Sequence, residues 1–149
     1  FGVFGVYSPT LTEIYAEVFR ELGMKRALIV HGHDGLDEIT VTTTSRVSEL
    51  KDGTITTYDL YPERYVGMTY PVEELLGGNA IENAAILTGI LDGKEQGARR
   101  AIVLLNSGAA IYTAGAADSI EDGVRLAAES IDSGAALEKL QILIRSSKE

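Results

Sequence analysis

The stretch from Arg26 to His31, RALIVH, gives the clearest indication of the fold class of this 149-residue chain. It is short, largely apolar and bounded by charge and glycine, which is the pattern of a parallel strand buried on both faces. Another apolar run, FGVFGVY, occupies residues 1–7. Between the two, residues 11–22 carry apolar side chains at helical spacing and end at Gly23. The pattern predicts a βαβ unit with parallel strands and a right-handed crossover.

The start of this first helix has two candidate signals. Pro9 suits a first helical turn that Ser8 caps from outside. Thr10 and Glu13 have the spacing of a competing capping box. Both signals place the helix after the apolar run, so the βαβ prediction does not depend on the choice.

A β-hairpin and a helical half follow. Asp52-Gly53 between residues 46–51 and 54–60 is a strong two-residue hairpin signal. From Val72 onward the chain reads as helical, and residues 98–115, which also resemble a strand, are predicted to form a buried helix. Helix starts are marked by Asn79 with Glu82 and by Ser119 with Asp122. No linker interrupts the sequence, so residues 1–149 are expected to form a single α/β unit.

Composition excludes several classes of function. Thirteen Lys and Arg against 22 Asp and Glu give a net charge of −9, which argues against a nucleic-acid-binding protein. The absence of cysteine excludes disulfides and thiolate catalysis. No apolar run is long enough for a membrane span, so we expect a cytoplasmic protein. The opening at Phe1, without Met or a polar lead-in, predicts that the chain is part of a longer protein.

The loop HGHDGLDE, residues 31–38, is the candidate site. It follows the second predicted strand, at the edge where α/β sheets place their ligands. Asp37 and Glu38 are neighbouring hard oxygen ligands, and Mg²⁺ typically takes one or two protein carboxylates. The alternative is a solvated acidic turn without a ligand. From the residues alone, both interpretations stay open.

His31, His33 and Asp34 offer a different metal hypothesis. Two histidines at i and i+2 could join the aspartate in a transition-metal site. We favour instead a strand-end histidine that hydrogen-bonds the backbone, next to an exposed one. The chain contains two histidines in all, which weakens a zinc site further. No nucleophile elbow or phosphate-binding glycine fingerprint is present.

Several stretches together resemble one enzyme family. They are VYSP at 6–9, ALIVHGHDGLDEI at 27–39, GGNAIENA at 77–84, LLNSGAAIY at 104–112 and AAESIDSGAA at 127–136. In this order they resemble the C-terminal part of the anthranilate phosphoribosyltransferase family, over essentially the whole chain. The resemblance implies part of the nucleoside phosphorylase/phosphoribosyltransferase catalytic fold.

The resemblance also implies an activity and a cofactor. The family is a group of glycosyltransferases that transfer a phosphoribosyl group from phosphoribosyl diphosphate to anthranilate in tryptophan biosynthesis. By position, Asp37 and Glu38 match the pair that binds Mg²⁺ in the family. The family's Gly-Thr-Gly-Gly-Asp loop, its Lys-His-Gly-Asn motif and the arginine that faces anthranilate are absent. We therefore expect no catalytic or substrate-binding residues here beyond the metal pair, and an inactive isolated chain.

Other interpretations remain beside this one. They are a pyrimidine nucleoside phosphorylase-like enzyme, a non-catalytic relative acting as a binding module, and a folded piece that binds nothing. A truncated sheet also exposes an edge or an apolar face. We therefore expect the chain to form a homo-oligomer or to associate with the missing N-terminal part.

Overall fold

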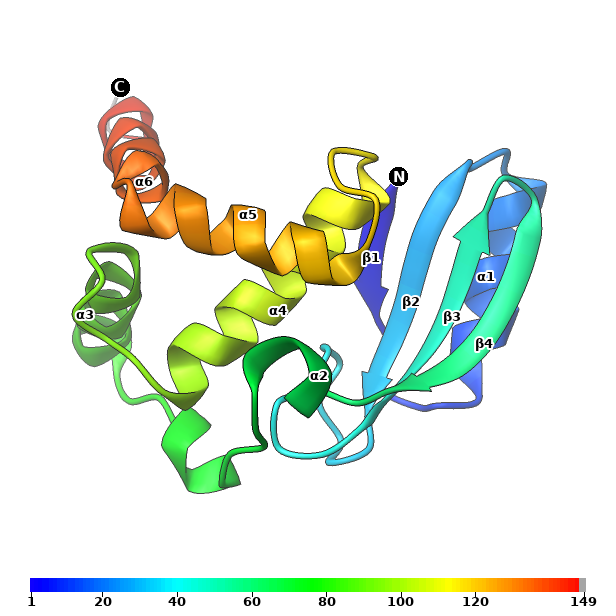
Figure 1. Cartoon of the computed structure of the whole chain (residues 1–149), viewed down its shortest axis with the longest axis horizontal. Helices are drawn as coiled ribbons and strands as arrows, with labels where there is room; N and C mark the ends of the chain where they lie inside the picture. The colour runs from blue at the N-terminus through cyan, green and yellow to red at the C-terminus, as the bar shows by residue number, and fades with distance from the viewer. Residues whose placement is uncertain (148–149) are drawn as a thin grey trace.

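A computed structural model describes residues 1–147 (Figure 1). Its elements are β1 (Gly2–Gly5), α1 (Leu11–Glu21), β2 (Arg26–Gly32), β3 (Ser45–Lys51), β4 (Thr54–Leu60), α2 (Glu63–Val66), the 3-10 turn η1 (Val72–Leu75), α3 (Ala80–Leu91), α4 (Ala98–Thr113), α5 (Ile120–Asp132) and α6 (Ala135–Ser146). A βαβ unit and a hairpin thus precede a helical half. The predicted fold class is confirmed.

The four strands form one mixed sheet in the order β1-β2-β3-β4. β1 and β2 are parallel, with Val3 opposite Leu28, whereas β2 with β3 and β3 with β4 are antiparallel. The hairpin turn has positive φ at both central residues, 48° at Asp52 and 84° at Gly53. Positive φ at both positions is what a tight turn matching strand twist requires, and glycine meets it without a steric cost.

Helices cover both faces of the sheet. In β2, Ala27 and Ile29 pack on the α1 side with Ala16, while Leu28 and Val30 pack on the α4 side. This alternation follows from the two-residue period of a strand, and it explains why β2 is apolar throughout. Figure 1 shows α1 and α4 on opposite sides of the sheet, with α3 and α6 beyond α4 and α5.

Helix α4 confirms the prediction of a buried helix over residues 98–115. Leu105 and Ala109 on its sheet-facing side are fully buried. On another side α4 crosses α5 so closely that a Cβ on Gly108 would lie 2.5 Å from the backbone nitrogen of Val124. The helix is thus packed between the sheet and a second helix, which accounts for its small and apolar residues.

The predicted helix caps are confirmed at two of three places. Asn79 and Glu82 form a capping box at the start of α3, and the Ser119 side chain accepts from the backbone N–H of Asp122 at the start of α5. Neither signal for the first helix forms a side-chain cap. Thr10 is the residue before α1, and its hydroxyl pairs with that of Ser8 at 2.9 Å.

Several apolar side chains lie on the surface. Phe1 beside edge strand β1 is 75% exposed, Ile81 of α3 is 83% exposed and Leu143 of α6 is 65% exposed. These exposed side chains lie on three different parts of the chain. Within residues 1–147, no helix has both the length and the apolar character needed to cross a lipid bilayer.

Candidate functional site

The candidate site is the loop that leaves β2 and leads to β3. Its backbone turns tightly, because the Gly32 N–H donates to the Leu36 carbonyl at 2.7 Å and the Gly35 N–H donates to the Gly32 carbonyl at 2.8 Å. Gly35 has a φ of 99°, a conformation that favours glycine. The turn brings Asp37 and Glu38 to the end of the sheet where β2 finishes, as expected for a ligand loop.

Asp34 stabilises this loop from within. Its carboxylate accepts hydrogen bonds from the hydroxyls of Thr40 and Thr42, each at 2.5 Å, and from the Leu36 N–H at 3.2 Å. Burial alone would raise the pKa of this carboxyl group. The hydrogen bonds to its charged form outweigh that effect, so the pKa of Asp34 lies below its ordinary value.

The two histidines do not form a metal site with Asp34. His31 is buried, and its Nδ1 lies 2.8 Å from the Val6 carbonyl oxygen. Because a carbonyl oxygen only accepts, Nδ1 donates this bond. His33 is exposed and lies 3.2 Å from an Asp59 carboxylate oxygen. The expectation of a strand-end histidine bonded to the backbone, beside an exposed one, is confirmed.

Asp37 and Glu38 are exposed, as Asp34 is, but they differ from it in their contacts. Among the described residues, neither carboxylate accepts a hydrogen bond or forms an ion pair with another side chain. No cluster of three or more His, Asp or Glu side chains in residues 1–147 could hold a metal ion. Two neighbouring carboxylates are a donor set that could hold Mg²⁺, with water and phosphate oxygens completing its coordination.

The backbone of the loop packs directly against the backbone at the end of β1. A Cβ on Gly5 would fall 1.6 Å from the carbonyl oxygen of Asp37 and 2.6 Å from its carbonyl carbon. Only glycine permits this approach of two backbones. The end of β1 therefore sets the position of the Asp37 peptide, and Gly5, which no sequence motif singles out, belongs to the site.

Glu38 also borders a hollow of about 600 Å³ between η1, α3 and α4. Its wall is mainly apolar and includes Leu36, Ile90 and Ile102. The guanidinium of Arg99 lies in the same wall and donates to the Leu76 carbonyl at 2.7 Å. One of the two free carboxylates thus stands at the rim of a cavity.

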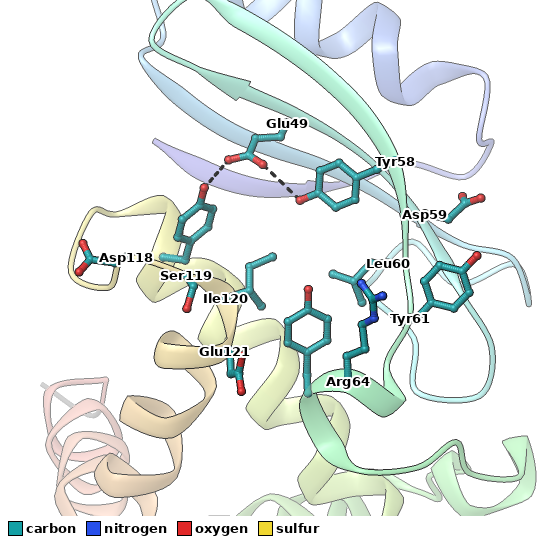
Figure 2. A pocket seen from close by; sticks show the side chains of 12 residues that line it. Glu49, Tyr58, Asp59, Leu60, Tyr61, Arg64, Asp118, Ser119, Ile120 and Glu121 are labelled. Atoms are coloured by element: carbon teal, nitrogen blue, oxygen red, sulfur yellow. Dashed lines mark hydrogen bonds between the residues drawn. The ribbon is translucent and has the colours of Figure 1, made fainter.

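A second cavity, of about 390 Å³, is lined by tyrosines and shown in Figure 2. In it the Glu49 carboxylate accepts hydrogen bonds from Tyr112 at 2.6 Å and from Tyr58 at 3.2 Å. Burial, and then the charge of Glu49, raise the pKa of Tyr58. These polar groups satisfy one another, and the lining includes neither Asp37 nor Glu38. We regard this network as structural.

Comparison with known proteins places the chain in a family. The sequence profile of the glycosyl transferase family, a/b domain, matches residues 1–137. The chain belongs to the glycosyl transferase family. This match covers the sheet, the Asp37–Glu38 loop and helices α1 to α5.

Relatives within the glycosyl transferase family carry a common name. An anthranilate phosphoribosyltransferase of Desulfosudis oleivorans is 50% identical over 146 residues, which are 98% of this chain and 43% of that protein. The crystal structure of the anthranilate phosphoribosyltransferase from Thermus thermophilus superposes with a TM-score of 0.83 at 39% identity, over 92% of this chain and 40% of that one.

A third similar protein is the anthranilate phosphoribosyltransferase from Saccharomyces cerevisiae in complex with phosphoribosyl diphosphate and Mg. It superposes with a TM-score of 0.82 at 27% identity, over 93% of this chain and 40% of that one. The chain thus spans less than half the length of these relatives. The resemblance to a phosphoribosyltransferase catalytic domain is confirmed for the part present.

Proposed function

We propose that the chain is the metal-binding part of an anthranilate phosphoribosyltransferase of tryptophan biosynthesis. The proposal is carried by the exposed carboxylates of Asp37 and Glu38, which lie without side-chain partners in the described structure at the end of β2. The 50% identity to an enzyme of that name over 98% of the chain supports it. Mg²⁺ is the proposed cofactor, and phosphoribosyl diphosphate and anthranilate are the proposed substrates of the intact protein.

In the proposed reaction the bond between the sugar C1 and the diphosphate breaks, and a bond from C1 to the anthranilate nitrogen forms. The nitrogen loses a proton and diphosphate leaves. Mg²⁺, when bound, neutralises the negative charge that develops on the leaving group. Asp37 and Glu38 act as ligands that hold the cation, and they transfer no proton. The cation that they hold would also bridge the acidic chain to an anionic substrate.

The proposal assigns the chain only part of an active site. Residues 1–149 act as one unit, the C-terminal portion of the catalytic domain, and the diphosphate-cradling loop lies outside it. The isolated chain is therefore inactive, and it associates either with the rest of the enzyme or with a second copy. The intact enzyme is proposed to work in the cytoplasm. Measurable consumption of anthranilate by the purified chain would contradict this division of the site.

Calorimetry tests the metal site on the chain itself. We expect Mg²⁺ with diphosphate to bind the wild-type chain and to raise its melting temperature, because a ligand that binds only the folded state stabilises it. Asp37→Asn and Glu38→Gln should each lose that binding. Asp118→Asn and Glu138→Gln remove exposed carboxylates elsewhere and serve as matched controls. Equal binding by all five proteins would exclude Asp37 and Glu38 as the ligands.

A further inference from the structure

Asn106 of helix α4 contacts the backbone one residue beyond the carboxylate pair. Its Oδ1 accepts from the Ile39 N–H at 3.1 Å, and its Nδ2 donates to the Ile39 carbonyl at 2.8 Å. The same Nδ2 donates to the Ile102 carbonyl, one turn earlier in α4, at 3.0 Å. A single side-chain amide thus binds both polar groups of one loop residue. It does so across 67 positions of sequence.

This arrangement is unfavourable for the helix alone. Asparagine is a poor residue for a helix interior, because its side chain competes for backbone hydrogen bonds. Here the bond to the Ile102 carbonyl orients the amide toward the loop. The local cost is offset by satisfying two backbone groups of Ile39 that the partly buried surroundings would otherwise leave without a partner.

The Ile39 side chain provides a second attachment. It is fully buried in the same core cluster as Leu105, the neighbour of Asn106 in α4. Ile39 is therefore held by its backbone and by its side chain. On the other side of the carboxylate pair, Gly5 lies in close contact with the Asp37 carbonyl. Asp37 and Glu38 are thus carried on a short segment that is immobilised at both ends.

We propose that Asn106 is a positioning residue for the metal site, a role that rests on the proposed function of Asp37 and Glu38. Its side chain hydrogen-bonds to Ile39 and Ile102 and not to either carboxylate. It fixes the peptide that follows Glu38, so that both carboxylates are presented in one geometry before the cation arrives. Groups that orient metal ligands in this way typically change metal affinity by about 10- to 100-fold when removed.

The test uses Asn106→Leu, which has a similar volume and no hydrogen-bonding group. The control is Thr113→Val in the same helix, where the buried hydroxyl donates to the Ala109 carbonyl at 2.7 Å and does not contact the loop. We expect Asn106→Leu to weaken Mg²⁺–diphosphate binding about tenfold. Thr113→Val should lower the melting temperature while leaving the affinity within about twofold of wild type.

Hydrogen exchange distinguishes a positioning role from a general loss of stability, because it measures the protection of the Ile39 amide directly. The Ile39 amide should exchange faster in Asn106→Leu than in Thr113→Val at matched stability. If Asn106→Leu does not fold, Asn106→Asp keeps the acceptor but lacks the donor to the Ile39 carbonyl. It should weaken binding in the same direction.

The outcomes separate the two proposals. Binding to wild type that is lost in Asp37→Asn and unchanged in both Asn106 variants overturns the positioning role alone. Binding that is absent from wild type, or unaffected by Asp37→Asn, overturns the metal site and the positioning role with it. A tenfold loss in Thr113→Val equal to that in Asn106→Leu would also overturn the positioning role, because any damage to α4 would then suffice.

Discussion

Replacing Gly5 with alanine should displace the candidate metal loop. The new Cβ would lie 1.6 Å from the Asp37 carbonyl oxygen, whereas real Cβ contacts essentially never fall below 3.0 Å. The two backbones must therefore separate by at least about 1.4 Å, the difference between these distances. Because the obstacle is a backbone atom, no side-chain rotation relieves it. Either β1 or the Asp37 peptide must move.

The cost of this separation has two parts. Forcing an extra carbon into a packed position typically lowers the free energy of unfolding by about 1–3 kcal/mol. If the Asp37 peptide moves by this distance, its carboxylate changes position relative to that of Glu38. We therefore expect Mg²⁺–diphosphate affinity to fall about tenfold or more, as it does when the support of a metal ligand is removed.

Denaturant unfolding and calorimetry on the same samples measure both effects. Gly2→Ala is the matched control, since it lies on the same strand and its Cβ would meet only the movable ring of Phe4, at 2.7 Å. Wild-type affinity in Gly5→Ala, with a loss of stability below about 0.5 kcal/mol, would contradict this expectation. It would show that the loop tolerates displacement and that Gly5 has no part in the site.

Two further predictions concern Asp34, which stabilises the candidate loop, and Leu105 in the core. Asp34→Asn should lower the free energy of unfolding by less than about 1 kcal/mol at neutral pH, because the hydrogen bonds favour the charged carboxylate while solvent screens this exposed group. Since the pKa of Asp34 is lowered on folding, this contribution is present above the unfolded value of 3.8 and is lost as pH falls through the folded pKa. Thermal unfolding of both proteins between pH 7 and pH 2 measures this contribution. A stability difference between wild type and Asp34→Asn that grows on acidification would contradict the expectation. Leu105→Ala empties a fully buried position between α4 and the sheet and should cost about 3 kcal/mol in urea unfolding. The exposed Leu143→Ala should change stability by less than about 0.5 kcal/mol, and equal losses in the two would contradict the assigned core.

Much of the fold is predictable because its causes are local. The apolar run of β2, the Asp52-Gly53 turn and the Asn79 cap each depend on neighbouring residues, and all three form as predicted. Residues 98–115 were ambiguous between strand and helix on periodicity, and small residues such as Ala109 favoured the helix. The close crossing of α4 and α5 at Gly108 explains why this helix carries small residues.

Sequence spacing predicts hydrogen bonds less well where a side chain can reach more than one partner. Thr10 and Glu13 have the spacing of a capping box, yet the Thr10 hydroxyl pairs with Ser8 instead. Asp34 stands beside two histidines in sequence and binds threonines within its own loop, which agrees with the favoured interpretation that these three residues form no transition-metal site. Spacing along the chain shows which partners a side chain can reach. It does not show which partner the packed structure brings closest.

Local features of the sequence are enough to predict the class of the fold, the position of the Asp37–Glu38 loop after β2 and the family resemblance that indicates what this loop does. Strand and helix periodicity, turn residues and residue order are all properties of neighbouring positions. The contacts that hold this loop in place depend on tertiary packing. Gly5 and Asn106 reach it from distant parts of the chain, through a backbone contact and a side-chain amide. Such contacts form only when packing brings the elements together, and no spacing in the sequence records them.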